Sequence, residues 1–272
     1  MSDVRTYYLQ LAVLGILFSV VTFIIFPVQD GASTSSILQA VGSGITRGAA
    51  LMITFIVYQT QEVSRVVPVT QSFPIFVAII ATIFLGEILG PVEWGAIFLT
   101  VGGVVLISFQ RVPGKNAVPL GLPFVFMICI SLLLAISNVL SKAALDEISV
   151  WNMYAFTMLF AGLSFLALGA KAHTVREMLS LARTKRGILL PVSVMILALF
   201  GNLLLFASFD RGPVSLASTI VGTRPLFVFI YTALLTLLFP KVLYEPLTPK
   251  TGLIKLVSIA MIVSGGAMLT LL

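Results

Sequence analysis

The chain has 272 residues, of which 59% are hydrophobic and only 10% are charged. A soluble domain carries about 25% charged residues, so this chain cannot cover itself with polar surface and we interpret it as an integral membrane protein. The net charge of +6 does not indicate nucleic acid, because the charges lie between apolar segments and form no basic stripe with interleaved aromatic residues. One cysteine and one histidine exclude an intrachain disulfide and disfavour a zinc or iron site, so we expect no metal and no cofactor.

Nine apolar segments are each long enough to cross a bilayer, which takes about 20 residues. The first is not a secretory signal, because its apolar run is too long and no small-residue cleavage site follows Phe26-Pro27. The connection 171–187 alternates charged with apolar residues, and it could form a short surface helix. The predicted spans are 5–27, 37–58, 66–85, 92–110, 119–140, 150–170, 188–207, 213–239 and 252–272.

The cations predict an orientation in the membrane. If the connections alternate between the two sides, one side holds eleven cations and the other holds only Lys142 and Arg211. The positive-inside rule then places the N-terminus and the 171–187 connection in the cytoplasm. With nine spans the C-terminus lies outside, in a multi-pass protein of the cell (plasma or inner) membrane.

An internal repeat organises the chain. Residues 63–77 (VSRVVPVTQSFPIFV) align with residues 214–228 (VSLASTIVGTRPLFV) at an offset of 151 positions. The fold class we predict is all-α integral membrane, with two inverted repeats of transmembrane helices. The first repeat, 1–116, has four spans and the second, 117–272, has five. Nothing in the first half matches 119–140, so we expect that a fifth, N-terminal helix is missing from the first repeat.

Each repeated segment places a proline inside a span. Proline donates no backbone N–H, so Pro74 and Pro225 free the carbonyls of Thr70 and Val221. In lipid such groups must face protein or a water-filled cavity. We favour a polar lining for a substrate path, and the alternative is a kink needed only for helix packing. The polar neighbours are Thr70, Gln71 and Ser72 in the first copy and Ser218, Thr219 and Thr223 in the second.

Arg224 lies eleven positions into its predicted span, roughly 16 Å at about 1.5 Å per residue. A charge near the midplane costs on the order of 3 kcal/mol and normally faces a cavity or a partner. Because a guanidinium matches carboxylate and phosphate, we hypothesise that Arg224 binds an anionic group of the substrate. The alternative is a structural arginine tied to helix-end carbonyls. The repeat places Phe73 at the equivalent position.

Arg47 has two interpretations. It lies in a G-x-x-x-G pattern, Gly44 to Gly48, that lets helices approach closely. Within its span it is a candidate substrate residue, but if the span begins nearer Val41 it only reaches to the membrane surface.

Other polar residues in the spans divide between the cavity and helix packing. Tyr58 and Asn202 are the expected cavity residues, whereas Asn138 is expected to bond across helices. No carboxylate lies in the middle of a span, which favours an anionic, zwitterionic or neutral solute over an organic cation. The pairs Gly102-Gly103 and Gly265-Gly266 indicate close helix contact.

A set of short motifs runs through both halves of the chain: Pro74-Ile-Phe-Val, Leu85-Gly86-Glu87, Trp94-Gly95 and Val101-Gly102-Gly103, with Arg211-Gly-Pro-Val-Ser-Leu-Ala, Pro225, Gly265-Gly266, Ala135-Ile-Ser-Asn138 and Lys142 in the second half. With these motifs the chain resembles EamA-type permeases of the drug/metabolite transporter superfamily. The resemblance implies ten helices in two inverted five-helix repeats around a central cavity, which move solutes by alternating access. This chain departs from it with nine spans, and it has Leu238-Phe-Pro240 where the first copy has Leu85-Gly86-Glu87.

We therefore predict a secondary transporter for a small organic metabolite, an amino acid or another carboxylate. The alternatives are a non-transporting membrane scaffold or subunit, and an intramembrane enzyme, for which no H-E-x-x-H, paired intramembrane aspartates or G-x-S-x-G is present. The expected partners are a small-molecule substrate and the lipid bilayer, with no nucleic acid, and a homodimer is left open. The predicted substrate-binding residues are Arg224, Thr223, Ser72, Gln71, Thr70, Tyr58, Asn202 and Arg47, with Pro74 and Pro225 as helix breakers and no catalytic or metal-binding residue.

Overall fold

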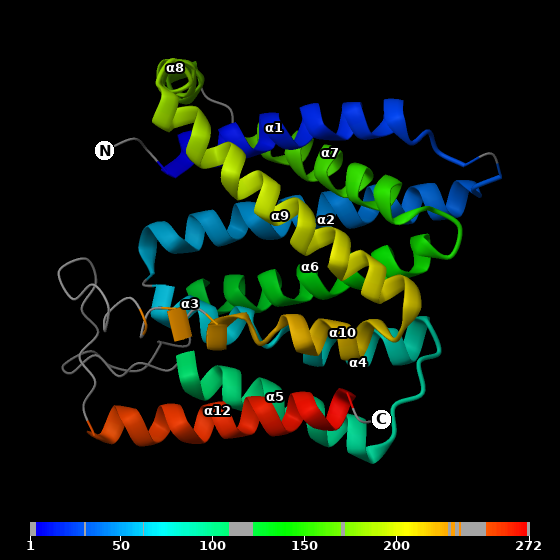
Figure 1. The fold of residues 1–272 in the computed structure, drawn as a ribbon, viewed down its shortest axis with the longest axis vertical. Helices are drawn as coiled ribbons and strands as arrows, with labels where there is room; N and C mark the ends of the chain where they lie inside the picture. The colour runs from blue at the N-terminus through cyan, green and yellow to red at the C-terminus, as the bar shows by residue number, and fades with distance from the viewer. Residues whose placement is uncertain are drawn as a thin grey trace. The chain divides into compact units, whose positions relative to one another are not determined.

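A computed structural model describes residues 4–29, 31–61, 63–108, 122–169, 172–227, 230–231, 234 and 249–270. Parts of the predicted spans 92–110, 119–140, 213–239 and 252–272, and the segment Leu238-Phe-Pro240, lie outside the described residues. The helices are α1 (Val4–Ile25), α2 (Thr34–Thr60), α3 (Val63–Thr70), α4 (Phe73–Phe84), α5 (Pro91–Ser108), α6 (Leu122–Leu145), α7 (Val150–Gly169), α8 (Ala172–Leu181), α9 (Lys185–Arg211), α10 (Val214–Val221) and α12 (Pro249–Thr270) (Figure 1).

The all-α membrane class is confirmed by these helices. Five of them are long and apolar enough to cross a membrane by length and composition, and three shorter apolar helices lie at 73–84, 91–106 and 253–269. Two predicted spans are not continuous. The first, 66–85, is divided into α3 and α4, and the described part of 213–239 begins with α10 and continues as a separate helical segment, 224–227.

The repeat predicted from the sequence is visible in the helix boundaries. An offset of 151 carries α2 onto α9 and α3 onto α10, residue for residue at both ends. The segment 119–140, which has no match in the first half of the sequence, contains most of α6 among the described residues. The two-repeat architecture is therefore built into the secondary structure of the chain.

The chain forms two compact units, each drawn from both halves of the sequence. The first unit comprises Met1–Ile53 and Ile136–Gly212, and the second comprises Thr54–Ala135 and Pro213–Leu272. In the first unit α1 packs along α7, and in the second α5 packs along α12 (Figure 1). Because α7 and α12 hold the same places in the second half as α1 and α5 in the first, each unit pairs repeat-related helices.

Small residues allow these close helix pairs. A Cβ atom at Gly44 of α2 would lie 2.7 Å from Cβ of Phe160, and one at Gly48 would lie 2.9 Å from Cα of Ala161, so the G-x-x-x-G face of α2 packs directly on α7. In the second unit a Cβ atom at Gly103 would lie 2.9 Å from Cβ of Met261. The close contacts expected for Gly44, Gly48 and Gly103 are confirmed, whereas a Cβ atom at Gly266 would meet nothing within 4 Å.

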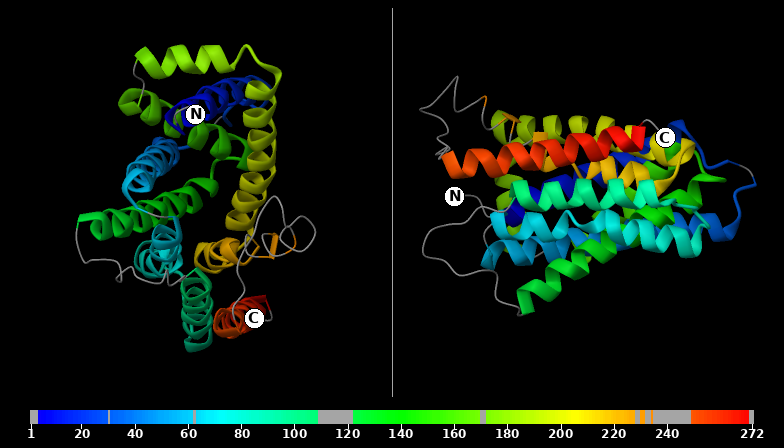
Figure 2. Two further views of the ribbon diagram at one scale, coloured as in Figure 1. Left: turned by 90° about the vertical axis from the view of Figure 1, so that its left-hand side faces the viewer. Right: turned by 90° about the horizontal axis from the view of Figure 1, so that it is seen from below.

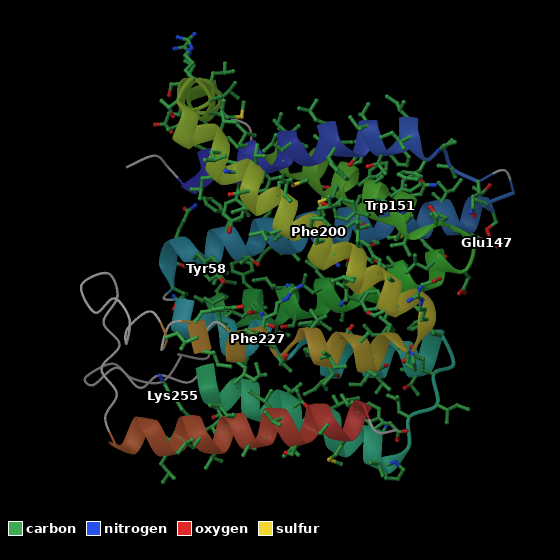
Figure 3. The ribbon with its side chains drawn as sticks, viewed as in Figure 1. Tyr58, Glu147, Trp151, Phe200, Phe227 and Lys255 are labelled. Carbon is green, nitrogen blue, oxygen red and sulfur yellow. The ribbon has the colours of Figure 1, made fainter. Side chains whose placement is uncertain are left out.

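Large apolar side chains remain exposed along the spans, as a lipid-facing surface requires. The helix α9 is the clearest case, and Figure 3 labels Phe200 on it. Its exposed apolar residues include Ile188, Leu189, Leu197, Phe200 and Leu204.

Candidate functional site

The second compact unit contains both broken spans, and the first break lies between α3 and α4. The helix α3 ends at Thr70, and Ser72 keeps helical dihedral angles (φ −77°, ψ −2°) before α4 begins at Phe73. Pro74 thus lies in the first turn of α4, where a proline removes no intrahelical hydrogen bond. The expectation of a proline inside a continuous span is wrong here, because the chain ends one helix and begins another at the proline.

The second break has the same construction. The helix α10 ends at Val221, Gly222 keeps helical angles (φ −58°, ψ −16°), and the next helical segment begins at Arg224. Pro225 occupies the first turn of this segment, and Phe227, labelled in Figure 3, lies at its described end. Each repeat therefore contributes one span that is broken just before its proline.

The two breaks also share their hydrogen bonds. Three backbone bonds and one hydroxyl bond recur at the offset of 151, which indicates that the repeat conserves the geometry of the break rather than its residues. In the first copy, the backbone N–H of Gln71 donates to O of Val67 (2.9 Å), that of Ser72 to O of Val69 (3.2 Å) and that of Ile75 to O of Ser72 (3.1 Å), and the Ser72 hydroxyl donates to O of Val69 (2.6 Å).

In the second copy, the backbone N–H of Gly222 donates to O of Ser218 (2.9 Å), that of Thr223 to O of Ile220 (3.1 Å) and that of Leu226 to O of Thr223 (2.9 Å). The Thr223 hydroxyl donates to O of Ile220 (2.6 Å).

The breaks pack against each other. A Cβ atom at Gly222 would lie 3.0 Å from Cγ of Pro74, so the second break approaches the first through a residue without a side chain. The broken spans run in opposite directions (Figure 1), as inverted repeats require. Gln71 holds the position equivalent to Gly222, and its side-chain Oε1 is buried with no hydrogen-bond partner among the described residues.

The carbonyls at the end of α3, which include the Thr70 carbonyl that Pro74 was expected to free, face protein. Oγ of Ser131, from α6, lies 2.9 Å from O of Val69 and 3.3 Å from O of Thr70. The hydroxyl of Thr70 donates to O of Val66 in its own helix at 3.1 Å. Both Thr70 groups are therefore used within the unit, and at this residue the packing interpretation of the break is the better one.

Glu87 joins the two copies at the other end of the unit. It follows α4, and its carboxylate accepts the backbone N–H of Val214 (2.6 Å), the N–H of Ser215 (3.3 Å) and the Ser215 hydroxyl. It thus caps the first turn of α10, where unpaired N–H groups and the helix dipole favour an anion. Glu87 stood out in the sequence only as part of the Leu85-Gly86-Glu87 pattern. The available signal was a difference between the copies, because the second copy has Leu238-Phe-Pro240 in place of this pattern.

Arg224 distinguishes the second break from the first. Its side chain is exposed, and it has no hydrogen-bond or salt-bridge partner among the described residues. Its counterpart Phe73 is only 6% exposed and belongs to the core of the unit. The alternative of an arginine tied to helix-end carbonyls finds no support in the described part of the chain. One copy thus presents a cation where the other buries a phenyl ring.

Arg47 belongs to the first unit and lies in the middle of the 27-residue helix α2. The alternative in which it only reaches to the membrane surface assumed a span that begins near Val41, whereas α2 begins at Thr34. Its Nη2 donates to Oδ1 of Asn138 at 3.0 Å, and its guanidinium carbon lies 6.0 Å from the ring centroid of Phe206. The expectation that Asn138 bonds across helices is confirmed, and its partner is an arginine that the sequence also marked.

The remaining predicted residues divide between the units. Asn202, in the first unit, donates Nδ2 to O of Ala198 in its own helix at 2.7 Å. Tyr58 lies in the last turn of α2, half-buried, and is assigned to the second unit (Figure 3). The second unit therefore brings together Thr70, Gln71, Ser72, Thr223 and Arg224 at the two breaks.

Comparisons with known proteins agree with this architecture. A family model described as the EamA-like transporter family matches residues 2–109 and 122–271. A crystal structure of a protein matches all of this chain and 88% of its own, with a TM-score of 0.66 and 16% sequence identity, which shows the fold alone. No curated protein matches the chain.

Proposed function

Because this chain belongs to the EamA-like transporter family, whose members carry small solutes across membranes, we propose that it transports a small organic carboxylate or amino acid by alternating access. The observation that carries the proposal is Arg224, an exposed cation without a partner among the described residues at the break of the second repeat. The substrate carboxylate would supply the missing partner.

The chemistry of the site favours a carboxylate. A guanidinium presents a planar fork of N–H donors that matches both oxygens of a carboxylate. Close to the middle of a membrane an unpaired charge costs on the order of 3 kcal/mol, so pairing with substrate recovers free energy that the empty site lacks. The buried Oε1 of Gln71 adds an acceptor to the same unit, which suits the ammonium group of an amino acid.

The breaks supply the moving parts of this proposal. Helical dihedral angles at Ser72 and Gly222 leave each half-span free to change its angle without unwinding either helix. Bending at such element-terminal residues is a common way to open and close a site. In a transporter built from repeats at 1–116 and 117–272, paired broken helices let access alternate about a fixed site.

The proposal includes an orientation. The cation count puts the N-terminus in the cytoplasm of a plasma or inner membrane. Arg47, bonded to Asn138, and Asn202 would contribute to substrate binding in the first unit, and Tyr58 would contribute in the second.

Uptake into proteoliposomes tests the proposal. We expect Arg224→Ala to lower the uptake rate constant (kcat/KM) by about 10- to 100-fold, the range for a lost charge-assisted hydrogen bond. Arg224→Lys should retain part of the activity because it keeps the charge but loses the fork. Arg211→Ala, which removes an exposed arginine at the end of α9, is the matched control. Unchanged uptake by a well-expressed Arg224→Ala protein would remove this role from Arg224.

A further inference from the structure

The short helix α8 lies across the end of the first unit. It joins α7 to α9, and in Figure 1 it is seen along its axis while α1 and α7 run across the page; Figure 2 shows it lengthwise. Its 10 residues span only about 15 Å, too short to cross a bilayer. Because both of its neighbours along the chain are spans, α8 lies at the level of the membrane surface.

The inner side of α8 is fixed to the unit. Thr174 is buried, and Oγ1 of Thr6 donates to Oε2 of Glu177 at 2.8 Å. A further contact just beyond α8, from Nε2 of Gln10 to O of Gly187 at 3.4 Å, ties α1 to the start of α9. The rotation of α8 about its axis is therefore set by contacts with α1.

The side of α8 that faces away from α1, with the residues just after the helix, is both apolar and basic. Leu179 is 55% exposed, and the side chains of Arg176 and Arg183 are exposed as well. At 100° per residue Leu179 and Arg176 lie about 60° apart on the helix surface. An apolar strip beside a basic one is the pattern of a helix that rests in the membrane interface, with its leucine toward the acyl chains and its arginine among the headgroups.

The charged residues in and around α8 are mostly basic. Residues 171–186 contain five cations, Lys171, Arg176, Arg183, Lys185 and Arg186, and a single carboxylate, Glu177. That carboxylate is held by Thr6 on the inner side. Clusters of four to eight basic residues beside a span are the sequence feature associated with anionic lipids.

We propose that α8 and the basic residues after it form a binding surface for anionic phospholipid headgroups. The phosphate of the lipid pairs with Arg176 and Arg183 while Leu179 contacts its upper acyl chain. The surface belongs to the first unit, and it does not depend on the transport proposal.

Quenching by brominated lipids tests this surface in the full-length protein. A fluorescent label on Leu179→Cys, in a Cys129→Ser background, reports which lipid lies beside α8 in nanodiscs of phosphatidylglycerol mixed with phosphatidylcholine. We expect brominated phosphatidylglycerol to quench the label in preference to brominated phosphatidylcholine, and the preference to fall as salt is added. Equal quenching by the two lipids, or no quenching by either, would overturn the proposal.

Charge variants separate a specific surface from general attraction. With both arginines present, the association constant for the anionic lipid should be on the order of 30-fold higher than for phosphatidylcholine. Arg176→Gln with Arg183→Gln should reduce this ratio of association constants toward one. Arg176→Lys with Arg183→Lys should keep most of it. The matched control, Lys142→Gln with Arg211→Gln, removes two charges elsewhere and should leave the preference unchanged. If the protein with both Arg176→Gln and Arg183→Gln keeps the full preference, or the control loses it equally, the proposal fails.

Discussion

The two broken spans share a backbone but not their surroundings. Each breaks just before a proline, and four hydrogen bonds recur between them at the same offset. Around the first break, the Ser131 hydroxyl lies within hydrogen-bond distance of the carbonyls at the end of α3, and Phe73 is buried. Around the second, Arg224 is exposed and Glu87 caps the helix that leads to the break.

This difference shows that two copies of a duplicated fold can keep the same backbone while the side chains beside it differ. The shared hydrogen bonds keep the bend that both repeats need, because a broken helix in a membrane must satisfy its own backbone. The side chains next to the bend are then free to diverge. One copy uses its position before the proline for packing, and the other uses it to present a charge.

We expect the largest loss of stability from a substitution at Gly222, where the second break packs against the first. A Cβ atom there would meet Cγ of Pro74 at 3.0 Å and O of Thr219 at 3.1 Å. We expect Gly222→Ala to lower the free energy of unfolding by roughly 1–3 kcal/mol, as overpacking does. Thermal unfolding in mild detergent measures it. Gln71→Ala at the equivalent position is the control and should change stability little, since the Oε1 it removes has no partner among the described residues. Equal effects at both positions would show that the breaks do not pack as described.

A substitution of Glu87 tests the helix cap that is found at the start of α10. Glu87→Ala removes the acceptor for two N–H groups and a hydroxyl at the start of α10. Loss of a helix cap costs about 1–2 kcal/mol, so the melting temperature should fall. Glu87→Gln, which keeps one acceptor oxygen, should recover part of the loss. A variant as stable as the wild type would mean that α10 does not need this cap.

Ser131 tests the feature found only at the first break. Ser131→Ala removes the hydroxyl that lies within hydrogen-bond distance of the Val69 and Thr70 carbonyls. Hydrogen bonds between membrane helices contribute about 0.6 to 2 kcal/mol, so we expect a destabilisation of about 1 kcal/mol by equilibrium unfolding. Ser264→Ala on α12, whose hydroxyl bonds only its own helix, is the matched control. If both changes have the same small effect, the carbonyl at the first break does not depend on α6.

The smallest effect is expected outside the breaks, at Glu147 (Figure 3). Hydrogen bonds from the Ser33 side chain and N–H, and from the Ser36 hydroxyl, lower the pKa of this carboxyl below its usual value near 4.5. A lowered folded-state pKa adds stability that is complete above the unfolded-state pKa and is lost as the pH falls through the folded-state pKa. Glu147→Gln should therefore lower the melting temperature slightly at pH 7, and the difference should shrink as the pH falls below 4.5. A constant difference across that range would contradict the assignment.

Local pattern was enough to predict much of this fold. Hydropathy located the spans, and the offset found from residues 63–77 carried α2 and α3 onto α9 and α10. The glycine pairs predicted the close contact of α5 with α12. These features depend on residues near one another in sequence or on the repeat itself.

The contacts between residues far apart in the sequence could not be predicted in the same way. Arg47 and Asn138 were each marked, but they are 91 residues apart, and Glu87 and Ser215 are 128 apart. No periodicity encodes such pairs, because they depend on which helices pack together. The sequence also failed to predict that the helix ends before Pro74. The chain remains largely apolar from α3 into α4, and only the backbone shows that the helix ends at Thr70.

Binding of a matched pair of ligands to purified protein measures the role of Arg224 most directly. The pair is the carboxylate that competes best in the uptake assay and its primary amide, each titrated calorimetrically into the wild type and into Arg224→Gln. The wild type should bind the acid at least about tenfold more tightly than the amide, and the variant should bind the two alike. A preference for the acid that survives intact in Arg224→Gln would contradict the assignment of Arg224 as the partner of a transported carboxylate.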